Sequence, residues 1–334
     1  MKTPVTTLKW LIQREFWEHK GAFVWAPVIL SGVMIFFLFL TLGIGNNLQN
    51  FELHVAQQGA DADQTAAETV HIGGTVPVTL IEKGAVTVGN NYMWFSAPIF
   101  MMLAFVIFFY CLNTLYDERR DRSILFWKSL PISDTMTVAS KVAVAMVAVP
   151  LVTVAIGFIT SLVALLMGCI ALSMRGINIF SLVFTTPAVY LAPFEVLGML
   201  PLYLLWALPT IGWLLMVSSW ARSKVFLWAV GVPVLSIVLL GWAEKMFGFG
   251  WDVSWYVKNI VGRLLLSVFP GGWLHVAVGD SGRAFSMQHS GMELGSLFQN
   301  SWLALRTFEL WAGVVAGIIM ICVAVFMRRW REDN

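Results

Sequence analysis

The part of the sequence with the densest candidate chemistry is a run of six charged residues, Asp117-Glu118-Arg119-Arg120-Asp121-Arg122. The apolar tetrapeptide Ile124-Leu125-Phe126-Trp127 follows it, then Leu130-Pro131, and Ser133 stands where it can cap the next helix. A loop that only joins two helices does not need four large apolar residues at this place. The combination predicts a short helix that lies along a membrane face and docks on a cytoplasmic protein. Simple anchoring at the membrane interface is the alternative.

Two carboxylates interrupt otherwise apolar stretches, Glu195 and Glu309. An ionisable group at membrane depth is by default a functional hypothesis, so both are candidates for a cargo path or a gate. Each stands only one or two residues inside its apolar stretch. Hydration at the membrane interface therefore explains them equally well.

Residue patterns for metal binding or catalysis are missing from the sequence. Four of the five histidines lie in the predicted external segments, and they show neither H-x-x-x-H spacing nor a neighbouring cysteine. The chain has no G-x-S-x-G elbow and no G-x-x-x-x-G-K-[ST] phosphate loop. We therefore expect no metal, no cofactor and no catalytic residue in this chain, and hence no enzyme. The cysteines are expected to be reduced and buried, because all three stand in apolar runs: Cys111, Cys169 and Cys322.

The composition shows which solvent surrounds these groups. Of the 334 residues, 58% are hydrophobic and 12% are charged, and the mean hydropathy is +0.78. Soluble domains are nearer to about 25% charged, so the composition indicates a protein embedded in lipid. The net charge of +2 excludes a strongly basic nucleic-acid binder. Three cysteines do not form a disulfide scaffold.

Apolar segments long enough to cross a bilayer, which takes about 20 residues in a helix, occur six times. The fourth contains Pro201 and Pro209 and the fifth contains Pro233, so we expect these two spans to face protein rather than lipid. Static kinks and a moving hinge are both consistent with these prolines. The predicted spans are 22–44, 93–115, 142–171, 194–220, 225–243 and 307–327.

Basic residues are divided unequally between the two sides of the predicted membrane. If the spans alternate, one set of connections has 58 residues and carries 14 of the 21 Lys and Arg residues, and the other has 133 and carries 7. Positive charge is retained in the cytoplasm, which predicts that both termini are cytoplasmic. The basic set is 1–21, 116–141, 221–224 and 328–334, and the other is 45–92, 172–193 and 244–306.

The connections predict further elements around a single transmembrane domain, 1–334. Segment 1–21 has apolar residues at helical spacing between residues 5 and 20 and a basic face, which predicts an in-plane helix at the cytoplasmic interface. External loop 45–92 predicts a small β-hairpin, with strands at Thr75–Ile81 and Ala85–Val88. External segment 244–306 predicts an interfacial or re-entrant helix from Val253 to Val268, with Asp252, Asn259 and Arg263 on its polar faces. The expected fold is thus an all-α membrane protein.

With these spans, the runs Asp117–Ser123 and Lys128–Ser133 resemble the membrane subunits of ABC-2 type transporters. In similar permeases this run, the cytoplasmic coupling loop within 116–141, forms a coupling helix that fits a groove on an ATPase subunit. The resemblance implies a multi-pass exporter subunit in the cytoplasmic (inner) membrane, driven by a separate ATPase that binds ATP and Mg. It implies the ATPase contacts Glu118, Arg119, Arg120, Arg122 and Phe126.

The same resemblance implies the partners of the chain. They are two copies of the ATPase, a second permease subunit that is either identical or paralogous, and the lipid bilayer. The long external loop leaves room for an external accessory protein, and no nucleic acid is expected. Lipid, peptide, drug and polysaccharide exporters share this architecture, so the sequence does not name the cargo.

Two other classes of protein fit part of the pattern. A secondary transporter driven by an ion gradient would usually show internal repeats and charges near the membrane midplane, and the sequence shows neither. A membrane scaffold or sensor that does not transport would use the loop 116–134 only to recruit a cytoplasmic partner. Co-purification with a nucleotide-hydrolysing subunit separates the first reading from these two.

Overall fold

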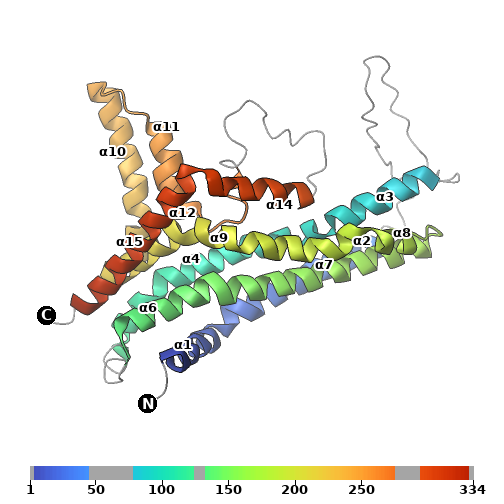
Figure 1. Ribbon diagram of the computed structural model, residues 1–334, viewed down its shortest axis with the longest axis horizontal. Coiled ribbons are helices and arrows are strands. Elements are labelled where there is room, and N and C mark those ends of the chain that lie inside the picture. Colours follow the sequence, from blue (N-terminus) through green and yellow to red (C-terminus); the bar gives the residue numbers. More distant parts are fainter. Residues whose placement is uncertain (1–3, 45–77, 124–131, 275–293, 331–334) are drawn as a thin grey trace.

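The computed structural model describes residues 4–44, 78–123, 132–274 and 294–330, and every regular element in these ranges is a helix (Figure 1). Six of the helices are long and apolar enough to cross a membrane, as the sequence predicts. This agreement supports a membrane-embedded helical protein. The six are Gly21–Gly43, Ile81–Arg120, Asp134–Met174, Pro187–Trp220, Leu227–Phe247 and Phe308–Trp330.

The N-terminal half of the chain forms three long helical rods. Two of them, of 40 and 41 residues, extend beyond a bilayer, because at 1.5 Å per residue they reach about 60 Å against an apolar core of about 30 Å. The first rod is α1 (Pro4–Glu18), η1 (Gly21–Trp25) and α2 (Ala26–Ile44); the second is α3 (Val78–Asn91), η3 (Tyr92–Ser96) and α4 (Ala97–Arg120); the third is α6 (Asp134–Ala143), η4 (Val144–Ala148) and α7 (Val149–Met174).

The C-terminal half contains the other three spans and several short helices. The spans are α9 (Pro187–Trp220), α10 (Val232–Phe247) with η5 (Leu227–Gly231), and α15 (Phe308–Trp330). The short elements are α8 (Phe180–Thr185), α11 (Val253–Tyr256), η6 (Val257–Val261), α12 (Gly262–Leu266), α14 (Leu294–Leu303) and η7 (Ala304–Arg306). The predicted helix between spans five and six is confirmed over 253–266.

The predicted β-hairpin in the first external loop is wrong. Residues Val78–Asn91 form α3, which leads through η3 into the second span. Ala85 and Tyr92 are buried in a cluster with Val183 of α8 and Val189 of α9. β-Branched residues favour strands only weakly when tertiary packing opposes it, and here packing against α8 and α9 favours a helix.

Prolines interrupt the regular α-helical hydrogen bonding of the spans with π-helical turns but do not end the helices. Three of the four π-helical segments in the described ranges, η1, η4 and η5, end two residues before a proline. A proline lacks an N–H and displaces the carbonyl four residues earlier, and one wide turn relieves that clash. The prolines concerned are Pro27, Pro150 and Pro233.

The fourth span, α9, is the centre of the bundle. Most of its side chains between Leu202 and Ser219 are buried, and it crosses α15 closely. At the crossing, a Cβ on Gly212 would lie 2.5 Å from the carbonyl oxygen of Gly317, and a Cβ on Gly317 would lie 2.7 Å from the backbone of Leu208. Small residues allow such approach between membrane helices, so these two glycines set the position of α15.

The fifth span, α10, makes few contacts with the other spans of this chain, so the expectation that it faces protein stays a prediction. Its apolar side chains are largely exposed within this chain, and it packs mainly against α11 and η6. Together these helices project from the bundle (Figure 1). The carbonyl of Ala229, four residues before Pro233, accepts from the indole N–H of Trp213 on α9 at 2.9 Å, so η5 and a neighbouring span together accommodate this proline.

The two ends of the chain lie at the same end of the bundle (Figure 1), where α1 and α15 both contact α6. An even number of spans requires this. The three cysteines are free thiols, as expected, but only Cys111 and Cys169 are buried. Cys322 is exposed on α15, which corrects the prediction of three buried thiols.

Candidate functional site

A group of buried charges lies at the bundle end that holds both termini, and Lys141 of α6 is at its centre. The ammonium group of Lys141 lies 2.9 Å from Oε1 of Glu15 on α1, 2.9 Å from Oγ1 of Thr114 on α4 and 2.9 Å from Oε1 of Glu118 on α4. An ammonium has three donors, and these three oxygens match them. Lys141 therefore joins three helices through one atom.

Arg328 of α15 extends the group to a fourth helix. Its Nη1 lies 2.6 Å from Oε2 of Glu118, and its Nε lies 3.1 Å from Oδ1 of Asp134 at the start of α6. Glu118 therefore binds Lys141 with one oxygen and Arg328 with the other. We call Glu15, Glu118, Lys141, Arg328 and Asp134 the cytoplasmic ion network, following the predicted orientation.

Burial makes this network sensitive to the loss of a member. The side chains of Glu15, Lys141 and Arg328 are at most 4% exposed, Glu118 is 10% exposed, and Asp134 is 23% exposed. The four most buried charges balance, with two of each sign. Breaking a buried ion pair from one side costs about 3–5 kcal/mol, because the remaining charge has no partner.

Aromatic side chains seal the network on the α1 side. The hydroxyl of Tyr110 donates to Oε2 of Glu15 at 3.2 Å. The ring of Tyr110 also meets the rings of His19 and Phe23 edge to face, with centroids 5.1 Å apart in both cases. Water is thereby kept from the carboxylate of Glu15.

Sequence reasoning did not single out Glu15, Lys141 or Arg328. A signal for Glu15 was present, because it stands four residues after Leu11 and three after Ile12, on the apolar face of the amphipathic helix. Lys141 is likewise the one charge in the apolar run Val138–Ala148. Charges on apolar helix faces indicate buried pairs, but only the fold shows which acid meets which base.

The structure separates the predicted ATPase contacts into two groups. Glu118 points inward to the ion network, and the guanidinium of Arg119 donates to the backbone carbonyls of Ser218 and Ala221 at the end of α9, at 2.9 Å for Ala221. Arg120 and Arg122 are exposed. Phe126 lies outside the described residues.

The charged run is helical further than predicted. α4 continues to Arg120, and Arg122 has a positive φ of 55°, which turns the chain out of the helix. On the far side of the loop, the hydroxyl of Ser133 accepts from the backbone N–H of Met136 at 3.3 Å. The predicted cap of the next helix is confirmed, so both ends of the loop are fixed.

The two candidate acids in the spans lie in different surroundings. Glu195 is half-buried on α9 beside Gly295 of α14, and a Cβ on Gly295 would lie 3.3 Å from its Oε1. The side chain of Glu309 is exposed in the first turn of α15. Neither acid belongs to the cytoplasmic ion network, and their role in a cargo path or gate stays a prediction.

A second buried charge, Arg263 of α12, lies away from this network. The sequence places it on a polar helix face, but the structure buries it between α9 and α15. Its guanidinium stacks 3.5 Å from the ring centroid of Trp206, and its Nη2 lies 3.4 Å from the backbone oxygen of Glu309. Burial lowers the pKa of Arg263 to about 10, so that it remains protonated at neutral pH.

Side-chain hydroxyls of α9 hydrogen-bond to the backbone of the same segment and hold it in place. The hydroxyl of Thr210 donates to the carbonyl of Arg263 at 2.9 Å and accepts from the N–H of Ser267 at 3.1 Å. The hydroxyl of Tyr203 donates to the carbonyl of Val268 at 2.9 Å. The end of the predicted external helix is therefore docked on α9 and is not a loose loop.

No family model matches this chain, and no curated protein or solved structure matches it significantly. Within the described ranges, no three His, Cys, Asp or Glu side chains come together as metal ligands would. Four of the histidines, His54, His71, His275 and His289, lie outside those ranges. The site is therefore characterised by its ion pairs and by the charged loop that they support.

Proposed function

We propose that this chain is the transmembrane permease subunit of an ABC-2 type exporter in the cytoplasmic membrane, with both termini in the cytoplasm. The observation that carries the proposal is the way in which ion pairs attach the charged loop to the helix bundle. Glu118 ties the end of α4 to α6 and α15 through Lys141 and Arg328, and Arg120 and Arg122 remain exposed beyond it. An exposed, densely charged surface on a rigid base suits a docking site for a partner that does mechanical work.

The network gives this docking site a physical route to the spans. A displacement of the α4 end moves Glu118, whose two oxygens pull on Lys141 of α6 and Arg328 of α15. Lys141 in turn holds Glu15 of α1. Two-state transitions pass through packed elements and ion pairs of this kind, so a push on one loop reaches four helices.

The chain needs partners to work in this way. The sequence holds no P-loop, so ATP and Mg bind to a separate ATPase, two copies of which close around nucleotide. Two permease subunits, identical or paralogous, form the cargo path between them. The cargo-path role of Glu195 and Glu309 and that of an external accessory protein belong to the same proposal, as does the re-entrant position of residues 253–266.

The proposal is tested by purifying the full-length chain from its native membrane and measuring nucleotide hydrolysis in the co-purified material. The double variant Arg120→Glu plus Arg122→Glu reverses two exposed charges without touching the ion network. We expect it to weaken capture of the ATPase by about tenfold or more, since like charges across an interface cost several kcal/mol. The matched control is Arg222→Glu plus Lys224→Glu, which makes the same charge change in the other short basic loop.

The alternatives predict other results. A secondary transporter would carry cargo without a hydrolysing partner, and dissipation of the ion gradient would stop it. A scaffold would bind a cytoplasmic protein without nucleotide hydrolysis. Retention of a hydrolysing subunit by the Arg120 and Arg122 variant, with unchanged activity, would refute the docking assignment.

A further inference from the structure

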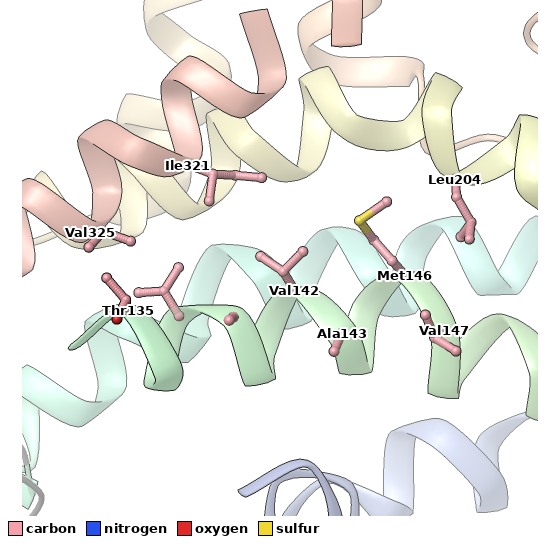
Figure 2. A pocket seen from close by; sticks show the side chains of 10 residues that line it. Thr135, Val142, Ala143, Met146, Val147, Leu204, Ile321 and Val325 are labelled. Carbon is pink, nitrogen blue, oxygen red and sulfur yellow. The ribbon is translucent and has the colours of Figure 1, made fainter. Parts of the chain in front are cut away.

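An apolar groove runs beside the cytoplasmic ion network, between α6 with η4 on one side and α9 and α15 on the other (Figure 2). Its volume is about 400 Å³, within the range of roughly 300–1,000 Å³ typical of ligand pockets. Figure 2 shows Val142 and Met146 facing Ile321 and Val325 across it, with Leu204 at one end. Apart from Thr135, the side chains that line it are all apolar.

The length of the groove matches one leaflet of a bilayer. Its wall on the α6 side runs from Thr135 to Val147, twelve residues apart, which is about 18 Å along a helix. Half of a hydrocarbon core of about 30 Å is about 15 Å. On α9 and α15 the residues that line the groove lie within the predicted spans 194–220 and 307–327, so this side of the groove is within reach of an acyl chain.

The charged end of the groove lies where lipid headgroups would be. Thr135 follows Asp134, whose charge is neutralised by Arg328. On the opposite wall, Arg329 stands four residues after Val325 and is therefore on the same side of α15, and it is exposed. An exposed cation at the headgroup level attracts a phosphate.

We propose that this groove binds one acyl chain of a phospholipid from the cytoplasmic leaflet, with the phosphate beside Arg329. The leaflet rests on the orientation in the proposed function, but the binding of an acyl chain does not. An apolar groove in a membrane helix bundle is stabilised by a hydrocarbon chain, because the chain makes van der Waals contacts with walls that would otherwise line a void. Because α6 and α15 form both the groove and the Asp134–Arg328 pair, the lipid stabilises the same helix contact as the ion network.

The test uses the full-length chain in vesicles of phosphatidylethanolamine and phosphatidylglycerol, without any ATPase. A trace of phosphatidylglycerol carries a photoreactive diazirine near the end of one acyl chain, and mass spectrometry maps the adducts after illumination. We expect adducts to concentrate on Met146 and Ile321 relative to the exposed side chains of α2.

Two matched variants sharpen the test. Ala139→Phe fills the groove from its exposed wall, and Ala155→Phe adds the same side chain to an exposed position of α7 outside the groove. We expect Ala139→Phe to lower the groove adducts severalfold, because its ring occupies the space that the acyl chain would fill. Ala155→Phe should leave them unchanged. Arg329→Gln should lower them by about fivefold, the contribution of one cation at an anionic lipid surface.

Two results would overturn the proposal. One is labelling spread evenly over the lipid-facing side chains of the wild-type chain, which shows ordinary solvation by lipid. The other is formation of disulfide-linked dimers by Ala139→Cys without groove adducts, which shows that a second copy covers the groove. Both results are independent of whether an ATPase binds the charged loop.

Discussion

Two buried cations, Lys141 and Arg263, are held in opposite ways. Lys141 has an oxygen at 2.9 Å for each of its three donors, and two of these oxygens belong to carboxylates. Arg263 lies on the face of Trp206, reaches one backbone carbonyl, and has an Nη1 without a hydrogen-bond partner in the described part of the chain. One cation is held by carboxylates in direct contact, and the other mainly by its fit against a ring, with only a longer-range attraction to the carboxylate of Glu309.

The difference shows what each region requires of its residues. The ion network depends on charge, because its four most buried members neutralise one another where little water reaches. The Arg263 contact depends on a flat cation that fits between an aromatic ring and the backbone at Gly313. Substitutions that keep the shape and lose the charge should therefore affect the two regions unequally.

The largest effect is expected for Lys141→Met. It leaves Glu15 and Glu118 buried with fewer cationic partners, which should lower the free energy of unfolding by about 3–5 kcal/mol. The measurement is unfolding of the full-length chain in bicelles, with Lys245→Met as the control at an exposed position. Adding Glu15→Gln should recover part of the loss. A loss below about 1 kcal/mol would mean that the pairs are not maintained in the membrane.

The next largest effect is expected for Gly313→Ala. Its new Cβ would collide with the guanidinium of Arg263, and overpacking at such a site costs about 1–3 kcal/mol. Gly241→Ala is the matched control, since nothing lies within 4 Å of a Cβ there. The same unfolding measurement checks both. Equal stability of the two variants would contradict the placement of Arg263 between α9 and α15.

Arg263→Met should be tolerated far better than Lys141→Met. It removes the contact with Trp206, worth about 1–2 kcal/mol when desolvated, but it also removes a buried Nη1 that has no partner. We expect a net loss below about 1.5 kcal/mol, and Arg263→Lys should do no better, because an ammonium lacks the flat face. A loss as large as that of Lys141→Met would show that Arg263 has an ionic partner.

The smallest effect is expected for Asp134→Asn. Asp134 is the most exposed member of the ion network, and Arg328 keeps Glu118 as its second partner. A loss of about 0.5–1 kcal/mol is expected, typical of a partly solvated pair. Glu118→Gln, measured beside it, should cost several times more. The reverse order would place the main partner of Arg328 at the surface.

The sequence predicts some parts of this structure better than others. The six spans and the Ser133 cap follow from hydropathy and local hydrogen bonding, which depend on near neighbours in sequence. The hairpin was mispredicted because α3 is helical through contacts with α8 and α9, far away in sequence. The pairing of Glu118 with Arg328 could not be predicted for the same reason, because the two residues are 210 positions apart in the sequence.

By itself, then, the sequence determined that lipid surrounds this protein, where its six candidate membrane spans lie, and the unequal division of basic residues that predicts its orientation. Composition and the length of the apolar stretches carry that information. Lipid accepts few charged side chains, and it offers no hydrogen-bond partners, so the backbone must satisfy its own polar groups within a helix. Only the tertiary structure decided that Glu118 and Arg119 face inward while Arg120 and Arg122 face outward. That choice depends on which helices meet at the end of α4, and the close approach of α9 and α15 at Gly212 and Gly317 helps to set it.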